Sequence, residues 1–472
     1  MIGTKRQRAK YVVGDFFSTN LACLLFNIVR YYFDSQIIAD YGSLTRFLSS
    51  PMVVVGQVVF PLVLLGVYYL SGYYNGVFLK SRLKEVITTA TTALVGMIII
   101  FFVAIVNDHI AGRAFAYELM LLLFAVLFVP VYLVRYSITR VATRKIHNRE
   151  WSFNTLIVGT SVTATKLEQR LREMKKSMGF NVVGYVQILD GELDRELNLP
   201  VYDIAEIEEV CARLNIKNLI VIPHRHGIKA TMSLVNSLLP LDCPIYISPD
   251  LYQLLTSKVR ISNVVGEPLV DISRSQMSAS TRNLKRVSDV VLSFITLLLI
   301  SPLLLVIAIL VKCDSRGPVF YRQERIGYHK KPFYIYKFRS MKVDAEAGGP
   351  ALSTLNDERI TRLGRVLRKY RLDELPNFWN VLRGDMSIVG PRPEREYYIK
   401  QILAKAPYYT LIHQVRPGIT SWGMVKYGYA SDVDGMIERL KYDLLYIENV
   451  SMLVDLKILF YTVQIVVTGK GI

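Results

Sequence analysis

The chain has 472 residues, of which 51% are hydrophobic and 20% charged, and a formal charge of +18 arises because 57 Lys and Arg outnumber 39 Asp and Glu. This length exceeds one ordinary domain, and the apolar share indicates that part of the chain lies in lipid, which excludes a wholly soluble protein. The positive charge suits anionic lipid headgroups, phosphorylated substrates or nucleic acid as partners, and the hydrophobic segments favour the first two. Four scattered cysteines without a CxxC pair predict neither a disulfide framework nor a zinc site.

The first third of the chain holds four hydrophobic segments, over residues 11–33, 52–73, 86–106 and 114–134. Each is close to the roughly 20 residues that a membrane-spanning helix requires. We predict a four-helix transmembrane domain over residues 1–140. Basic residues cluster before the first segment, between the second and third, and after the fourth, so both ends should lie in the cytoplasm. Few charges lie within the segments, which favours anchoring or assembly over a transport pathway.

Residues 151–272 alternate strand and helix patterns, which predicts a small parallel sheet. The turn that begins at Gly159 follows a buried strand, where a dinucleotide-binding loop would stand, but it keeps only the first glycine of GxGxxG. We therefore expect a degenerate Rossmann-like α/β domain that binds little or nothing. His224 and His226 follow a later strand and are interpreted as solvated loop residues.

A polar linker over residues 273–283 leads to an apolar segment, residues 285–312, that is long enough to span a membrane. Ser301-Pro302 falls near its middle, and cations flank both of its ends. Proline kinks a helix, and positive flanks favour keeping both ends on one side of the membrane. We predict a re-entrant helix that enters and leaves through one leaflet. The alternative, a spanning helix with a proline kink, would place the rest of the chain outside the cytoplasm.

Cations recur every few residues through the last third of the chain. Alternation of apolar and polar residues over 319–327 and 333–341 predicts a β-hairpin whose second strand brings Lys337 and Arg339 to one face. A helical apolar stripe over residues 359–370 has arginines on its remaining face. Such a helix suits the surface of an anionic membrane, although a solvated face over a small core explains the pattern nearly as well.

Two adjacent carboxylates, Asp373 and Glu374, lie among these cations. Carboxylates held among cations keep low pKa values and stay ionised, so the pair suits attack on an electrophile or metal binding. Asp373 also fits the N-cap of a helix that ends at Gly384, and a helix N-terminus attracts phosphate. Arg392 between two prolines and the loop that begins at Arg416 are constrained segments suited to an anion or a nucleotide.

Six short motifs occur in order in this part of the chain. They read Lys285-Arg286-x-x-Asp289, Ser301-Pro302, Lys337-Phe338-Arg339-Ser340-Met341, Leu372-Asp373-Glu374-Leu375-Pro376-Asn377, Val389-Gly390-Pro391-Arg392-Pro393 and Arg416-Pro417-Gly418-Ile419-Thr420. In this order they resemble the bacterial sugar transferase family, the monotopic polyprenyl-phosphate phosphoglycosyl transferases. The resemblance covers residues 281–472, and implies an α/β monotopic catalytic domain with a re-entrant membrane helix. The earlier parts resemble only the layout of longer members, including undecaprenyl-phosphate glucose phosphotransferases of exopolysaccharide or capsule synthesis.

The resemblance implies a reaction. A hexose-1-phosphate, with glucose-1-phosphate as the first choice, would pass from a UDP-sugar to undecaprenyl phosphate with release of UMP, through a covalent phosphosugar on Asp373. This would be the first membrane step of exopolysaccharide, capsule or O-antigen synthesis. Galactose or an N-acetylated sugar is the alternative. The implied partners are the UDP-sugar, undecaprenyl phosphate and membrane lipid, without nucleic acid, and a homodimer is left open.

The resemblance also assigns residues by motif position. Catalytic roles fall on Asp373, Glu374, Lys337 and Arg368, and Mg²⁺ would be held by Asp373 and Glu374. Substrate or phosphate binding falls on Arg339, Arg392, Arg416, Gly418, Thr420, Lys285 and Arg286, and the break of the re-entrant helix falls on Ser301 and Pro302. The chain departs from the family's usual Gly-Trp-Ala-Gln at Ser421, Gly423 and Met424.

The implied location is the bacterial inner membrane, in which the chain is multi-pass with its Rossmann-like and catalytic domains on the cytoplasmic side. Two other classes of protein are the alternatives. A membrane-bound nucleotide-sugar dehydratase or epimerase needs an intact glycine-rich loop and a tyrosine with a lysine four residues later, and no tyrosine here has that lysine. An assembly or regulatory role in a polysaccharide export complex is the other alternative.

Overall fold

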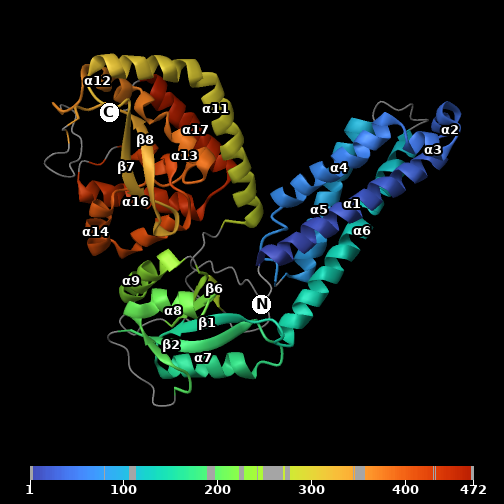
Figure 1. Cartoon of the computed structure of the whole chain (residues 1–472), viewed down its shortest axis with the longest axis horizontal. Helices are drawn as coiled ribbons and strands as arrows, with labels where there is room; N and C mark the ends of the chain where they lie inside the picture. Colours follow the sequence, from blue (N-terminus) through green and yellow to red (C-terminus); the bar gives the residue numbers. More distant parts are fainter. Residues whose placement is uncertain are drawn as a thin grey trace. The chain divides into compact units, whose positions relative to one another are not determined.

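A computed structural model describes residues 4–78, 80–105, 113–188, 197–222, 228–241, 243–247, 269–271, 277–343, 345, 357–428, 430 and 432–468 (Figure 1). The chain forms two compact units. The first comprises Met1–Phe153, Leu171–Phe180 and Ser278–Leu284, and the second comprises Asn154–Arg170, Asn181–Met277 and Lys285–Ile472. His224 and His226 lie outside the described residues.

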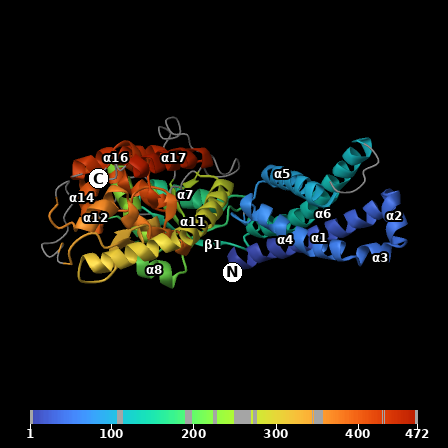
Figure 2. The ribbon, with the colours of Figure 1, turned by 90° about the horizontal axis from the view of Figure 1, so that it is seen from above.

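Long apolar helices build the first unit. They are α1 (Thr4–Phe33), α4 (Pro51–Leu70), α5 (Arg82–Ile100) and α6 (Arg113–His147), which lie side by side in Figures 1 and 2. Each corresponds to one of the predicted hydrophobic segments. A π-helical turn (Phe101–Ile105) prolongs α5, and the short helices α2 (Ser35–Tyr41) and α3 (Leu44–Leu48) follow α1. Counting α11 (Ala279–Asp314), five helices of the described chain are long and apolar enough to cross a membrane.

Buried charges hold the bundle together. Arg135 of α6 is fully buried, and it donates from Nε and Nη2 to the two carboxylate oxygens of Asp15 on α1, both at 2.8 Å. Its Nη1 donates to the Thr89 hydroxyl of α5 at 2.9 Å. Glu85 accepts hydrogen bonds from the hydroxyls of Tyr73 and Thr139. One guanidinium therefore joins three helices, although the sequence pattern suggests only a flanking cation at this position.

Replacing Asp15 by Asn is expected to lower the free energy of unfolding by about 3 kcal/mol, because the charge of Arg135 would remain buried without its partner. Thermal or denaturant unfolding of the purified protein in micelles measures this change. Asp40→Asn, at an exposed position of α2, is the matched control and should leave the transition unchanged. Equal stability of the two variants would show that the ion pair does not support the bundle.

A sheet with strand order β3-β2-β1-β4-β5-β6 begins the second unit. Its strands are β1 (Phe153–Val158), β2 (Phe180–Gln187), β3 (Val201–Asp203), β4 (Asn218–Val221), β5 (Ile245–Ile247) and β6 (Val270–Asp271). β1 pairs with β4, β2 with β3 and β4 with β5 in parallel, whereas β6 is antiparallel to β5. Helices α7 (Val162–Glu173), α8 (Ile207–Arg213) and α9 (Ile228–Leu238) alternate with the strands. The predicted small parallel sheet is confirmed.

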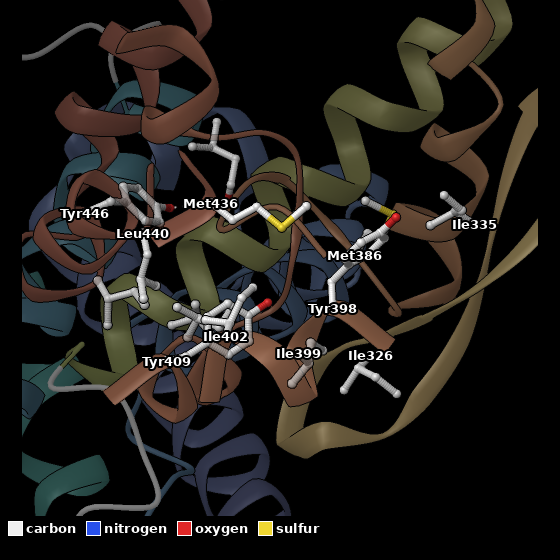
Figure 3. Packing of buried hydrophobic residues seen from close by; sticks show 14 of the residues in the cluster. Ile326, Ile335, Met386, Tyr398, Ile399, Ile402, Tyr409, Met436, Leu440 and Tyr446 are labelled. Carbon is white, nitrogen blue, oxygen red and sulfur yellow. Dashed lines mark hydrogen bonds between the residues drawn. The ribbon is translucent and has the colours of Figure 1, made fainter. Parts of the chain in front are cut away.

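A β-hairpin and a set of helices follow. The hairpin pairs β7 (Phe320–Ile326) with β8 (Pro332–Phe338) in the antiparallel sense, as predicted. The further elements are α12 (Arg362–Lys369), the 3-10 turn η5 (Leu372–Glu374), α13 (Asn377–Arg383), β9 (Ser387–Val389), α14 (Glu396–Lys405), the 3-10 segment η6 (Pro407–Gln414), β10 (Gly418–Thr420), α15 (Trp422–Lys426), α16 (Val433–Glu448) and α17 (Met452–Thr468). Figure 3 shows their core, in which Ile335 of the hairpin, Ile402 of α14 and Leu440 of α16 belong to one buried cluster.

Helix α11 bends within its length, as Figure 1 shows. Pro302 lies inside the helix, and the Ser301 hydroxyl donates to the carbonyl of Leu298 at 2.8 Å. A proline in a helix interior removes a backbone donor and kinks the helix, so we assign the bend to Ser301-Pro302. The helix begins at Ala279, inside the predicted linker, and it is continuous where a helix–break–helix was predicted.

Both arms of α11 contact the same folded domain. On the first arm, Asp289 accepts hydrogen bonds from the hydroxyl of Ser387 at 2.7 Å and from the backbone N–H of Ile388 at 3.2 Å, both at β9. On the second arm, Val311 is buried with Phe338 of β8. The hydrophobic cluster and the Asp289 hydrogen bonds therefore tie the two arms to one globular body.

Candidate active site

A cavity of about 270 Å³ opens beside the hairpin. Its described lining includes nine Lys or Arg side chains and two acidic ones, Asp373 and Glu394. Glu394 is already paired, because its two oxygens accept from Arg439 at 2.5 Å and from Arg325 at 3.2 Å. The cavity is therefore strongly cationic and suited to an anion such as a diphosphate.

Asp373 and Glu374 reach this cavity region through the turn η5 between α12 and α13. Arg371 adopts a left-handed conformation, with φ of 53°, and so turns the chain out of α12. Asn377 at the start of α13 accepts from the backbone N–H of Tyr336 at 3.1 Å. This hydrogen bond fastens α13 to β8, the strand that carries the predicted catalytic cation.

The prediction that Asp373 is the N-cap of a helix is wrong. Asp373 lies inside the 3-10 turn η5, and α13 is preceded by Pro376. An N-cap residue needs an extended backbone, whereas the left-handed Arg371 starts a turn that already includes Asp373. The predicted end of the helix at Gly384 is confirmed, and this glycine has the left-handed φ of 103° that a helix C-terminus favours.

Glu374 is held by three cations. Its Oε1 lies 2.6 Å from Lys337 Nζ and 3.5 Å from Arg392 Nη2, and its Oε2 lies 3.9 Å from Arg371 Nη1. Burial opposes ionisation of Glu374, but these cations outweigh it and hold the pKa of Glu374 below its usual range. Burial in turn lowers the pKa of Lys337, against the opposing effect of Glu374. Glu374 is therefore an ionised carboxylate.

Asp373 lines the cavity and is only 6% exposed. Among the residues that the structure describes, none forms a hydrogen bond or ion pair with its carboxylate. Burial raises the pKa of Asp373 to about 6, with a further increase from Glu374 that Lys337 and Arg368 oppose. The expectation that both carboxylates keep low pKa values is thus wrong for Asp373. Its carboxylate is the unpaired anion of the pair, which is what a nucleophile requires.

Arg368 and Arg339 also line the cavity, and each is fixed by neighbouring groups. Arg368 Nε donates to the hydroxyl of Ser340 at 2.9 Å. Arg339 Nη2 donates to the carbonyl of Ser315 at 2.6 Å and to that of Val311 at 3.3 Å, at the end of α11. Arg368 therefore lines the cavity, while Arg339 also fastens α11 to the hairpin.

Three predicted binding residues of the loop near β10 lie outside the cavity lining. Arg416 Nε donates to the carbonyl of Gly384 at 2.9 Å. Gly418 lies so close to the chain just after β9 that a Cβ would clash with the backbone nitrogen of Gly390. The Thr420 hydroxyl is 2.7 Å from that of Thr462 on α17. These contacts connect structural elements, and the geometry gives the three residues no contact with the cavity.

Lys285 and Arg286 are also absent from the described cavity lining. Lys285 Nζ donates to the Asp455 carboxylate of α17 at 2.7 Å. Arg286 donates to the carbonyls of Val381 and Leu382, at 2.7 and 3.1 Å, at the end of α13. Their charges hold the first arm of α11 on the domain, so a phosphate-binding role has no support from these contacts.

The sequence reasoning missed a buried charge cluster at the cavity wall. Glu394, Arg325 and Arg439 all line the cavity, and Glu394 forms an ion pair with each of the two arginines. Glu394 immediately follows the Val389–Pro393 motif, which was the available signal, but its partners lie 69 and 45 residues away in the chain.

The loop that departs from the family pattern is explained by packing. The backbone N–H of Gly423 donates to the Asp443 carboxylate of α16 at 2.9 Å. A Cβ at Gly423 would stand 2.5 Å from Arg439 Cγ and 3.0 Å from Asp443 Oδ1, so the alanine that is usual at this position would not fit without a shift. Met424 is buried against Arg439, with Sδ 3.7 Å from Nη1. These residues support the cavity wall.

A divalent metal at this site would need additional ligands from a substrate. Within the described ranges, no group of three or more His, Cys, Asp or Glu is placed to hold a metal ion. Mg²⁺, however, is usually bound by one or two carboxylates together with substrate phosphates and water. Among the described residues, Asp373 offers an unpaired carboxylate, and the ion pair of Glu374 Oε2 is the 3.9 Å contact to Arg371. This donor set fits a metal shared with a diphosphate.

Comparison with known proteins gives consistent matches. The family model described as bacterial sugar transferase matches residues 280–469. The chain is 40% identical to the UDP-N-acetylgalactosamine-undecaprenyl-phosphate N-acetylgalactosaminephosphotransferase of Aeromonas hydrophila, over 48% of this chain and 53% of that protein. It is 41% identical to the UDP-glucose:undecaprenyl-phosphate glucose-1-phosphate transferase of Escherichia coli (strain K12), over 49% of this chain and 50% of that protein. Both matches thus span about half of the relative's length. The chain is 39% identical to the exopolysaccharide production protein PSS of Rhizobium leguminosarum bv. phaseoli, over 40% of this chain and 98% of that protein.

Proposed function

The chain belongs to the bacterial sugar transferase family, and on this premise we propose that it transfers a sugar phosphate from a UDP-sugar to undecaprenyl phosphate and releases UMP. The observation that carries the proposal is Asp373, an unpaired and buried carboxylate in a cavity lined by nine cations. Such a site suits attack on the phosphorus atom of a phosphate, because the cations stabilise the negative charge on the phosphate oxygens. The product would begin the synthesis of an exopolysaccharide, capsule or O-antigen.

In the first step, a carboxylate oxygen of Asp373 attacks the β-phosphorus of the UDP-sugar. A bond forms between this oxygen and the phosphorus, and the bond from phosphorus to the bridging oxygen breaks, so that UMP leaves with its electron pair. The sugar phosphate remains on Asp373 as an acyl phosphate. Lys337, Arg368 and Arg392 surround the reacting groups and stabilise the negative charge on the phosphate oxygens.

In the second step, a phosphate oxygen of undecaprenyl phosphate attacks the same phosphorus. The bond to Asp373 breaks, the ionised carboxylate returns, and the lipid carries a diphosphate-linked sugar. No proton is gained or lost overall. Asp373 and Glu374 would hold a divalent metal, for which we propose Mg²⁺, and such a metal supplies charge neutralisation at the diphosphate.

The proposal is tested with the purified full-length protein in detergent, undecaprenyl phosphate and a panel of UDP-glucose, UDP-galactose and UDP-N-acetylgalactosamine, with Mg²⁺ or with a chelator. We expect UMP and a sugar-bearing lipid, with glucose as the first choice. The relatives named for glucose and for N-acetylgalactosamine are about equally similar, which is why the panel includes both. Absence of UMP with every donor would refute the transfer, and altered nucleotide sugar without UMP would favour a dehydratase or epimerase.

The rate of the first step should depend on the ionisation of Asp373. Because burial raises its pKa to about 6, the carboxylate is protonated and unreactive below that pH. We expect kcat/KM for the UDP-sugar to rise with pH and to level off above about pH 6. Single-turnover release of UMP between about pH 5 and 8 measures this profile. An acid limb near pH 4 would mean that another group, or an unperturbed carboxylate, controls the reaction.

The location proposed for this site is the cytoplasmic side of a bacterial inner membrane. Support comes from α11, since both arms of this apolar helix are fixed to one globular domain, which favours re-entry over crossing. Cys313 near the end of α11 is exposed and offers a test. With Cys211 and Cys243 replaced by Ser, an impermeant maleimide should label Cys313 in lysed but not in intact spheroplasts. Labelling of intact spheroplasts would mean that α11 crosses the membrane.

A further inference from the structure

A second cavity, of about 340 Å³, lies in the helical unit between α1 and α4. Val12 of α1 and Leu65 and Gly66 of α4 form its apolar lining, with the ring of Tyr69 beside them. A Cβ on Gly66 would meet no atom within 4 Å, so this glycine leaves open space. Both helices are long and apolar enough to cross a membrane, so the groove belongs to a surface suited to lipid.

The groove carries a positive charge. Arg8 lines it, and its Nε donates to the carbonyl of Tyr74 at 3.2 Å. Among the residues that the structure describes, no acidic side chain pairs with Arg8 or with Lys5, one turn earlier on α1. Asp15, further along the same helix, forms an ion pair with Arg135. The charge at this end of the groove is therefore not neutralised by the described protein.

We propose that this groove binds an acidic membrane phospholipid. The acyl chain would lie against Val12, Leu65 and Gly66, and the phosphate would lie at Arg8, where Asn75 adds an amide donor. Basic pockets between transmembrane helices commonly hold acidic headgroups. A zwitterionic lipid could make the same chain contacts, but its headgroup has no net charge to match the guanidinium of Arg8, which has no acidic partner among the described residues.

The lipid would also support the start of α11, because two residues that line the groove, Tyr69 and Asn75, form hydrogen bonds with this helix. The carbonyl of Tyr69 accepts from Asn283 Nδ2 at 2.6 Å, and Asn75 Nδ2 donates to Asn283 Oδ1 at 3.3 Å. Asn283 is buried in the first turns of α11. A bound lipid that contacts Tyr69 and Asn75 therefore stabilises the packing of Ser278–Leu284, which belongs to the first unit, against the bundle. Since a ligand that binds only the folded state raises stability, acidic lipid should raise the unfolding temperature.

The test uses the delipidated full-length protein, to which phosphatidylglycerol or phosphatidylcholine is added, with binding followed by native mass spectrometry. We expect wild-type protein to prefer phosphatidylglycerol. Arg8→Gln should weaken that binding about fivefold, which corresponds to one headgroup charge contact. Gly66→Leu should weaken binding of both lipids, because the new side chain fills the groove.

Two matched controls separate the site from general effects. Arg6→Gln removes an exposed cation of the same helix, and Val63→Leu enlarges an exposed side chain of α4, and neither residue lines the groove. Both variants should bind phosphatidylglycerol like wild type. Equal binding of the two lipids by wild type, or an equal loss in Arg6→Gln and Arg8→Gln, would overturn the proposal. Unfolding temperatures of all variants without lipid show whether each is folded.

Discussion

Asp373→Asn is expected to abolish turnover, with a decrease of about 10³-fold or more, because an amide cannot attack phosphorus and form the acyl phosphate. The variant should still fold. In the unsubstituted protein, the pKa of Asp373 near 6 means that the folded state disfavours the ionised carboxylate. Above that pH, ionised Asp373 therefore lowers the free energy of unfolding relative to a neutral group at the same position. Removal of this charge should leave the unfolding temperature unchanged or slightly higher at neutral pH.

UMP release and thermal unfolding, measured on the same preparation, test this prediction. Asp434→Asn is a matched control, because Asp434 is a largely exposed carboxylate paired with Lys405. It should retain full activity. Near-normal activity of Asp373→Asn would exclude Asp373 as the nucleophile, whereas loss of both activity and folding would show that the burial argument is wrong.

Lys337→Met is expected to reduce the rate of UMP release by about 10²-fold or more at neutral pH, because a cation at the reacting phosphate is lost. It should also destabilise the protein by about 2 kcal/mol, since Glu374 would keep only its longer contacts to Arg392 and Arg371. Lys337 lowers the pKa of Asp373, so the acid limb of the pH profile should move to higher pH.

Two comparisons isolate the effect of this lysine. Lys337→Arg keeps the charge beside Glu374 and should keep the acid limb near its original pH. Lys342→Met removes an exposed cation that lines the same cavity but makes no ion pair with Glu374 among the described residues. Its effect on the rate should be much smaller. An unchanged acid limb in Lys337→Met would show that Lys337 does not control the ionisation of Asp373.

Sequence patterns predicted the helices and strands that are marked by residues close together in the chain. Long apolar segments marked the helices of the first unit, and period-two alternation located the hairpin, in which Lys337 pairs with Tyr321. Contacts between distant residues were not predictable in this way. Arg135 and Asp15 lie 120 residues apart. The residues around Arg135 predict only a cytoplasmic charge that flanks a membrane-spanning helix.

Only part of the site was predictable, because short motifs do not contain the contacts between distant residues. Motif order led to Asp373, Lys337 and Arg368, which all line one cavity. Arg416 and Lys285 belong to equally specific motifs, but their side chains bind the protein itself. A motif shows that a residue matters, and does not distinguish a ligand contact from a structural one. Burial of the dyad, which sets the pKa of Asp373, depends on packing that no short pattern contains.

The covalent step is the central claim, and mass spectrometry of the protein after incubation with UDP-sugar alone tests it most directly. Without undecaprenyl phosphate, we expect one sugar phosphate per chain, UMP in equal amount, and the adduct on the peptide that contains Asp373. Addition of undecaprenyl phosphate should remove the adduct. UMP release that requires the lipid, with no adduct on the protein, would instead mean direct transfer between the two substrates and would contradict the mechanism.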